Sequence, residues 1–284
     1  MAHTPRNESE KATLAARRAW CYLVLVFFSF LCLFFFYILV INSTRTHFEI
    51  QKGFSLLPGK SLVTNFKNVL ADANIPVLTG IRNSLIVSAC SAALSVYFSA
   101  LTAYGIYAYN FKFKKAAFAI ILLIMTMPTQ VSALGFLQLI TKMGLKNSFI
   151  PLIVPSIAAP AVFFFMKQYL DASLPMEIVE AARIDGAGEF RIFWGILMPG
   201  VKPAWMTVIL FAVQGYWNMG TGSFIFKEEM KGISSGISAI TSISINRTGI
   251  GGAASILLMI VPLVTFVITQ SNVLDTCATA GMKD

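Results

Sequence analysis

The sequence predicts an all-α protein that crosses a lipid bilayer several times, and three observations carry this prediction. Hydrophobic residues make up 56% of the chain and charged residues 12%, which is about half the charge of a typical soluble domain. No Asp, Glu or His lies in the most apolar stretches. Since about 20 apolar residues cross the hydrocarbon core, six stretches are long enough to span it: approximately 20–41, 83–109, 117–140, 149–167, 204–220 and 252–271.

The N-terminal part predicts a tail followed by an uncleaved first helix. Residues 1–19 are polar and form no domain of their own. The apolar core from Cys21 to Ile41 is too long for a secretory signal, and no small-x-small cleavage site follows it. The basic clusters Arg17-Arg18 and Lys112 to Lys115 abut spans, and basic residues favour the cytoplasmic side. We therefore expect both termini to lie in the cytoplasm.

The remaining segments are loops and a short tail. Residues 42–82 and 221–251 are expected outside, 168–203 form the largest cytoplasmic insertion, and 272–284 form a cytoplasmic C-terminal tail. This leaves 20–271 as one transmembrane domain. None of the loops is long enough to form a soluble domain that holds a nucleotide or an active site.

Prolines are distributed unevenly among the predicted spans. Pro151, Pro155 and Pro160 interrupt the fourth span, and Pro128 interrupts the third. A proline removes a backbone hydrogen bond and kinks a helix. Broken helices at membrane depth persist where protein or a water-filled cavity satisfies the freed groups. The prolines therefore indicate either kinked packing within a bundle or helices that line a path.

The composition excludes several classes of function. The four cysteines lack metal-ligand spacing and lack paired extracellular positions, so we predict no metal site. Proton-coupled carriers and intramembrane hydrolases need ionisable groups within the membrane, and we predict no catalytic residue. The net charge of +9 is distributed among loops, which favours membrane-flanking residues over nucleic-acid binding.

The stretch from Gly53 to Ser61 superficially resembles a phosphate-binding loop. Five residues separate Gly53 and Gly59, whereas that loop requires four, and no apolar strand precedes it. Pro58-Gly59 is typical of a turn. We therefore predict no ATP site here.

Residues 173–203 predict two short helices joined by a sharp turn. Ser173, Pro175 and Glu177 are typical helix-start residues. Apolar residues then recur at i, i+3, i+4 and i+7, a spacing that predicts an amphipathic helix. They are Pro175, Ile178, Val179 and Ala182 in the first helix and Phe190, Phe193, Trp194 and Leu197 in the second.

The turn between these helices is expected at Asp185-Gly186. Gly186 can adopt a positive φ without steric penalty, and Asp185 is expected to cap the helix that follows. Pro199 and Pro203 mark the return to the membrane. The small residues Ala181, Ala182, Gly186 and Ala187 would let the surface of a partner approach the backbone closely.

The order of residues in this segment resembles a known signature. Glu180-Ala181-Ala182 is followed three positions later by Asp185-Gly186-Ala187, and then by a Phe-x-x-Ile-x-x-Pro run that ends at Pro199. This string is similar to the EAA loop of binding-protein-dependent ABC-importer permeases, specifically the carbohydrate (maltose-type) branch. Met198 stands where that branch usually has Leu. Further matches are Asn83-Ser84-Leu85, Trp217-Asn218, Pro262, Gln270 and Gly281-Met282-Lys283, whereas the rest of the tail from Val273 departs from the commonest version.

The resemblance implies a type I ABC importer permease fold in the cell membrane of a prokaryote. It implies that Glu180, Ala181, Ala182, Asp185, Gly186 and Ala187 form a coupling helix seated on a cytoplasmic ATPase dimer, with Pro199 joining it to the fifth span. A second homologous permease subunit and an extracytoplasmic sugar-binding protein, which the 221–251 loop would approach, are the other implied partners. ATP and Mg would be bound by the partner ATPase, so this chain would hold no cofactor.

Residues on the sugar path are a separate expectation. Sugars bind aromatic faces and side-chain amides, and residues of these types lie near the middle or end of a span: Gln130, Gln214, Tyr216, Trp217 and Asn218. Interfacial anchoring by the aromatic residues and interhelical hydrogen bonds by the amides are open alternatives. At the level of the whole protein, a stand-alone secondary carrier, an ABC permease for a non-sugar solute and a non-conducting scaffold or receptor also stay open.

Overall fold

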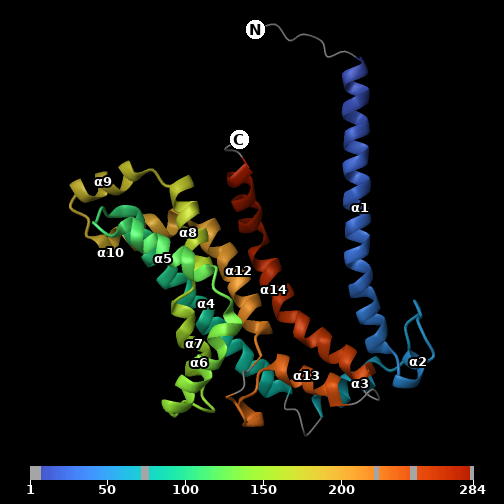
Figure 1. Cartoon of the computed structure of the whole chain (residues 1–284). Helices are drawn as coiled ribbons and strands as arrows, with labels where there is room; N and C mark the ends of the chain where they lie inside the picture. The colour runs from blue at the N-terminus through green and yellow to red at the C-terminus, as the bar shows by residue number, and fades with distance from the viewer. Residues whose placement is uncertain (1–7, 72–76, 221–223, 244–247, 282–284) are drawn as a thin grey trace. The chain divides into compact units, whose positions relative to one another are not determined.

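The computed structural model describes residues 8–71, 77–220, 224–243 and 248–281, and all regular elements within these ranges are helical (Figure 1). The prediction of an all-α protein is therefore confirmed. The chain divides into two compact units. Unit 1 comprises Met1–Val69 and Ser244–Ile256, and unit 2 comprises Leu70–Ile243 and Leu257–Asp284. Helix α14, Thr248–Gly281, runs through both.

The helices differ widely in length. Those of unit 1 are α1 (Glu8–Thr44), α2 (His47–Gln51) and α3 (Leu62–Leu70). The long helices of unit 2 are α4 (Val77–Ala108), α5 (Lys114–Met125), α6 (Thr129–Lys142), α8 (Pro160–Ser173), α9 (Met176–Ile184), α12 (Lys202–Asn218) and α13 (Ile233–Ile243). Its short elements are α7 (Ile150–Ile153), the 3-10 turn η1 (Val154–Ile157), α10 (Glu189–Ile192), the π-helical turn η2 (Phe193–Leu197), α11 (Met198–Gly200) and the 3-10 turn η3 (Glu228–Met230).

Four helices in the described ranges have the length and composition of membrane spans: Leu14–Thr44, Val77–Ala108, Ile150–Ser173 and Gly249–Ser271. A fifth span results if Glu189–Gly200 and Lys202–Asn218, which meet at a bend of 80°, are counted together. The predicted third span is divided between α5 and α6, as expected from Pro128, which stands immediately before α6. Several apolar spans are thus confirmed, whereas the count of six stays a prediction.

Two helices extend further than the sequence indicated. Helix α1 begins at Glu8, and α14 continues to Gly281, so much of each expected tail is helical. The residues from Glu8 to Ala19 are mostly strong helix formers, such as Ala, Glu, Lys and Arg. They continue the first span without a break.

The end of α1 is capped by the loop that follows it. Thr44 accepts a hydrogen bond at Oγ1 from the Gly59 N–H (2.7 Å) and at its carbonyl from the Ser61 N–H (2.7 Å). A Cβ on Gly59 would lie 2.5 Å from the Thr44 carbonyl oxygen. The glycine of this stretch is therefore required by a close backbone approach that completes the helix terminus.

Helix α4 is the centre of unit 2, where it packs against α8 and α12 (Figure 1). Buried small residues along α4 allow close approach, and its serines bond the interrupted fourth span. Ser91 donates to the Leu152 carbonyl and Ser99 to the Ala159 carbonyl, both at 3.4 Å. Hydroxyls of α4 thus bond carbonyls that lie beside the proline breaks.

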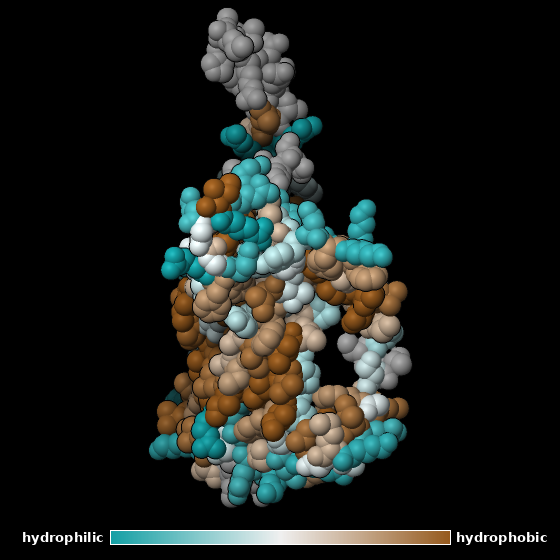
Figure 2. All heavy atoms as spheres, turned by 90° about the vertical axis from the view of Figure 1, so that its left-hand side faces the viewer, coloured by the Kyte–Doolittle hydropathy of each residue, from teal (hydrophilic) through white to brown (hydrophobic). Residues whose placement is uncertain are grey.

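Apolar and polar side chains are segregated on the surface of unit 2. On the face drawn in Figure 2, hydrophobic side chains gather between hydrophilic ones at the two ends. Exposed apolar residues on α5 and α6 include Ile120, Leu123, Leu134 and Leu139. This distribution matches a surface whose middle contacts lipid.

At a second proline break, a tryptophan side chain bonds the carbonyl that the proline leaves without a donor. Pro262 lies inside α14 and lacks the N–H that would bond the carbonyl four residues earlier, at Leu258. Trp217 is fully buried at the end of α12, and its Nε1–H donates to the Leu258 carbonyl at 2.8 Å. The indole replaces the bond that the proline removes.

This arrangement predicts a non-additive pair of substitutions. Trp217→Phe should destabilise the protein by about 1–3 kcal/mol, because it leaves the Leu258 carbonyl without its donor. In a Pro262→Ala background residue 262 supplies its own N–H, so the same substitution should cost about 1 kcal/mol less. Unfolding in detergent measures both, and strictly additive costs would contradict the argument.

Candidate functional site

Helix α9 begins and ends where the sequence indicated. Pro175 stands immediately before its first residue, and Glu177 lies in the first turn, where a carboxylate interacts favourably with the helix dipole. Val179 and Ala182 are buried in the core of unit 2, whereas Ile184 is 86% exposed. The predicted helix is confirmed, but only two of the four residues predicted for its apolar face are buried, because Pro175 and Ile178 are also exposed.

The turn after α9 is a Schellman motif built on Gly186. The Ala187 N–H donates to the Ala182 carbonyl and the Gly186 N–H to the Arg183 carbonyl, both at 3.0 Å. Gly186 has φ +78°, as predicted for this position. The expectation that Asp185 caps the next helix was wrong. That helix follows Gly188, and Asp185 instead closes α9 through its own N–H, which donates to the Ala181 carbonyl at 2.9 Å.

The second half of the segment runs through α10, η2 and α11. The four apolar residues predicted for one face of this half do not share it. Phe193 and Leu197 are buried, whereas Phe190 is 74% exposed. Trp194 stacks on Tyr97 of α4, with ring centroids 5.9 Å apart, while its other side remains accessible.

An ion pair joins the two halves across the turn. Arg183 Nε lies 2.8 Å from Glu189 Oε1, and the Arg183 guanidinium lies 5.0 Å from the centre of the Tyr109 ring. Glu189 also accepts a 2.5 Å hydrogen bond from the Tyr104 hydroxyl. These donors, with the Arg183 hydrogen bond as the largest cause, lower the pKa of Glu189 to about 2. The carboxylate is therefore charged throughout the physiological range.

The predicted partner-facing residues divide between two faces. Glu180, Ala181, Asp185, Gly186 and Pro199 are exposed. Ala182 and Ala187 face the core of this chain instead, because they lie on the side of α9 and its turn that packs against unit 2. Of the four small residues expected to admit a partner, Ala181 and Gly186 are therefore the accessible ones.

The predicted sugar-path residues lie in different surroundings. Trp217 is buried and donates to α14, as described above. Gln214 and Tyr216 are half-buried, and the exposed Asn218 donates from its amide to the Gln214 carbonyl at 3.0 Å. Gln130 lies in the first turn of α6, and its side chain is outside the described residues.

A second polar cluster holds the expected outer loop at the opposite end of α4. Asn83 donates to the carbonyls of Glu229 (2.7 Å) and Lys231 (3.1 Å), and Ser84 Oγ accepts from the Ile233 N–H at 3.0 Å. Asn147, whose φ is +52°, accepts at Oδ1 from two further N–H groups of this loop. The described part of the loop is thus anchored by side-chain amides.

Sequence reasoning did not identify Arg183, Glu189, Tyr104 or Tyr109 as site residues. The available signal was a pair of opposite charges on either side of Asp185-Gly186. A reversal at Gly186 brings such a pair together, but the tyrosines could be found only from the packing. Within the described ranges, no group of three His, Cys, Asp or Glu residues is placed to hold a metal ion.

Comparisons with known proteins place this geometry among transport proteins. The family model described as "Binding-protein-dependent transport system inner membrane component" matches residues 95–276. The arabinooligosaccharides transport system permease protein AraQ of Halalkalibacterium halodurans is 28% identical over 90% of this chain and 93% of its own length. A probable ABC transporter permease protein of Pyrococcus horikoshii is 30% identical over 80% of this chain and 84% of its own.

A solved structure has the same fold. It is a chain of a bacterial ABC transporter involved in the import of the acidic polysaccharide alginate, with a TM-score of 0.76 and 18% identity. The match covers 94% of this chain and 99% of that one.

The Arg183–Glu189 pair predicts a specific dependence on pH. A carboxylate whose pKa is lowered by folding stabilises the folded state above the pKa of unpaired Glu, near 4.5, and this contribution is lost as the pH falls toward 2. The stability difference between wild type and Glu189→Gln should therefore be constant above about pH 5 and shrink below about pH 4.5. Because the Glu189 side chain is 43% exposed, the full difference should be about 1 kcal/mol or less.

Thermal unfolding of both variants at several pH values measures this difference. Glu229→Gln, which removes a charge from an exposed side chain at the opposite end of α4, controls for net charge. A Glu189→Gln effect that is unchanged at pH 3 would contradict the assignment.

Proposed function

The chain belongs to the family of binding-protein-dependent transport system inner membrane components, and from this premise we propose that it couples a cytoplasmic ATPase to the import of a sugar. As a permease subunit of an ABC transporter it is not an enzyme, and family membership decides against a stand-alone carrier. The single observation that carries the coupling proposal is the segment 173–203. It presents an exposed, apolar-tipped pair of helices beyond the end of a membrane span.

The chemistry of this segment fits a docking surface for another protein. Ile178 (44% exposed), Ile184 and Phe190 project into solvent, with Ala181 and Gly186 between them in sequence. Exposed apolar residues grouped on a polar loop are typical of interaction sites. We assign Glu180, Ala181, Asp185 and Gly186 to the contact with the ATPase. Ala182, Ala187 and Pro199 would shape the segment from beneath and from its return to the membrane.

The partners follow from the same proposal. ATP and Mg would be bound by the ATPase dimer, a second homologous permease subunit would complete the membrane part, and a binding protein would deliver the solute outside. The anchored loop that includes Glu229, Lys231 and Ile233 is the surface we assign to the binding protein. It bonds the beginning of α4, whereas the segment 173–203 bonds the end of α4.

Orientation is supported by these same contacts. Arg183 donates to the Ala108 carbonyl at 3.4 Å, so the segment 173–203 lies at the same end of α4 as the basic cluster Lys112 to Lys115. Basic clusters next to spans favour the cytoplasmic side. We therefore propose that this end of unit 2 faces the cytoplasm, and we retain from the sequence the expectation that both chain termini do so.

The proposed solute is an oligosaccharide, as in the name of the AraQ relative. Of the sugar-path residues, Gln214 and Asn218 keep polar groups at or near the surface of α12, whereas the Tyr216 hydroxyl bonds the buried Ser95 and Ser156. Gln130 is retained from sequence alone. Trp217 would support the path indirectly, since its N–H is engaged by α14. A non-sugar solute is the alternative that transport assays would distinguish.

The first experiment is purification of the tagged chain from its host in mild detergent, with partners identified by mass spectrometry. Recovery of an ATPase, together with ATP-dependent uptake of labelled oligosaccharides by the reconstituted complex, supports the proposal. Uptake that persists after ATP depletion, or a chain recovered alone in several detergents, contradicts it.

A substitution on the exposed face tests the docking surface. Ile184→Asp should lower the amount of ATPase recovered by about tenfold or more, because docking would bury an unpaired carboxylate. Leu57→Asp is the control, since Leu57 is 77% exposed on the loop of unit 1 and should leave recovery unchanged. Equal recovery from both variants, with equal amounts of chain in the membrane, would exclude Ile184 from the interface.

A further inference from the structure

Two tyrosines at the end of α4 hold the two ends of the segment 173–203. The Tyr107 hydroxyl donates to the carbonyl of Leu174, the residue immediately before Pro175 and α9. The Tyr104 hydroxyl donates to Glu189, the first residue of α10. The helices that carry the proposed docking surface therefore lie between two hydroxyl contacts from one membrane span.

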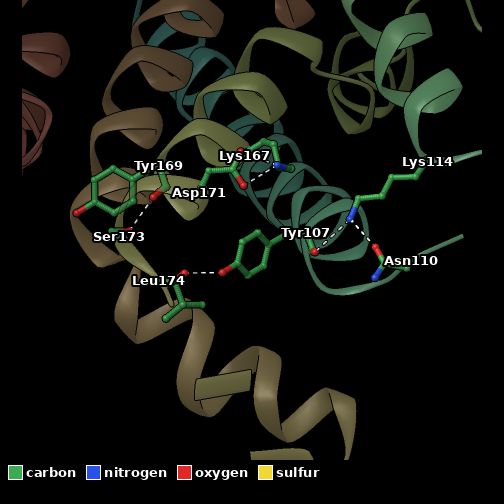
Figure 3. A network of polar contacts seen from close by, with 8 residues as sticks. All are labelled: Tyr107, Asn110, Lys114, Lys167, Tyr169, Asp171, Ser173 and Leu174. Atoms are coloured by element: carbon green, nitrogen blue, oxygen red, sulfur yellow. Dashed lines mark hydrogen bonds and ion pairs between the residues drawn. The ribbon is translucent and has the colours of Figure 1, made fainter. Parts of the chain in front are cut away.

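The contact of Tyr107 belongs to a polar network that includes three helices (Figure 3). Lys167 of α8 lies 5.9 Å from the centre of the Tyr107 ring and pairs with Asp171 at 2.6 Å. Lys114 of α5 donates to the Tyr107 carbonyl at 3.4 Å. Leu174 ends α8 in an extended conformation, and the last carbonyls of a helix lack donors within it. Tyr107 supplies one.

The contact of Tyr104 belongs to the ion pair across the turn. Tyr104 is buried, and its ring centre lies 6.0 Å from that of Phe193. Its hydroxyl bonds the carboxylate that also holds Arg183, and Arg183 in turn bonds the carbonyl of Ala108. A hydrogen bond to a charged acceptor is stronger than one between neutral groups. This end of the segment is thus fixed to α4 from both sides of the turn.

The covalent connections of the segment 173–203 to α8 and α12 transmit motion poorly, because neither connection is a continuous helix. The segment joins α8 through the non-helical Leu174-Pro175 pair and α12 through Val201, where the chain bends by 80°. Such joints absorb rotation. Apolar packing beneath α9 resists separation, but it is not directional, so the segment could rotate upon it. Directional hydrogen bonds at both ends oppose that rotation.

We propose that Tyr104 and Tyr107 are positioning residues that fix the segment 173–203 to α4, so that movement imposed by the ATPase displaces the span. This inference rests on the proposed function. Without the two hydroxyls, part of the movement produced by ATPase closure would rotate the segment about its two connections instead of displacing α4. A ligand drives a conformational change only through the state that it favours, and a loose segment adds states that leave the span in place.

The test compares Tyr104→Phe, Tyr107→Phe and the double variant in the complete complex reconstituted into liposomes. The number of solute molecules imported per ATP hydrolysed should fall about fivefold for each hydroxyl removed, the factor that corresponds to about 1 kcal/mol. The amount of bound ATPase and its basal hydrolysis rate should stay at wild-type levels. Tyr169→Phe is the matched control. Tyr169 of α8 lies beside the polar network of Tyr107 (Figure 3), and none of the bonds drawn in that network involves the Tyr169 hydroxyl.

A second readout is independent of the ATPase. Amide hydrogen exchange in residues 176–192 should accelerate in both variants and stay unchanged in the control. Unchanged exchange overturns the inference that the hydroxyls hold the segment. Faster exchange with an unchanged number of solute molecules imported per ATP hydrolysed overturns their role in coupling. The same role is overturned if complex yield, solute uptake and ATP hydrolysis all fall together while that number stays unchanged. Wild-type complex that shows no ATP-dependent uptake refutes the proposed function itself, and the inference with it.

Discussion

The structure depends on one constraint, which is that backbone groups released from helices must find hydrogen-bond partners within the protein, because lipid provides none. The chain interrupts its helices repeatedly, and hydroxyl, amide or indole groups supply the missing donors at several of these points. Ser91 and Ser99 serve the broken fourth span, Trp217 serves the carbonyl released by Pro262, and Tyr107 serves the end of α8. These contacts tie neighbouring helices together at the places where each helix is weakest.

Helix α4 carries most of these contacts, and this explains how one span can relate two distant surfaces. Asn83 and Ser84 near its beginning bond the loop assigned to the binding protein, whereas Tyr104 and Tyr107 near its end bond the segment assigned to the ATPase. A continuous helix of 32 residues extends about 48 Å at 1.5 Å per residue. Because α4 is one continuous helix, we expect that it can move as a unit, so that a displacement of one end also displaces the other.

How much of this was available from sequence depended on whether a feature is local. Apolar spans, the proline break before α6 and the positive φ at Gly186 follow from residue type at a single place, and each was predicted. The pairing of Arg183 with Glu189 needs the direction of the chain after the turn, and the bond from Trp217 to Leu258 needs the packing of α12 on α14. The cap at Asp185 was wrong for the same reason, since the Schellman turn moved the start of the next helix past Gly188.

The π-helical turn η2 shows how the fold separates an inner face from an outer one over a very short distance. Phe193 and Leu197 lie four residues apart and both face inward, whereas Phe190 and Trp194, also four residues apart, stay accessible. Phe193 packs beside Tyr97 and Tyr104 of α4, and Tyr97 also stacks on Trp194. The same aromatic cluster thus supports the buried and the exposed residues of the segment. Under the proposed function, force applied to Trp194 would reach α4 through Tyr97.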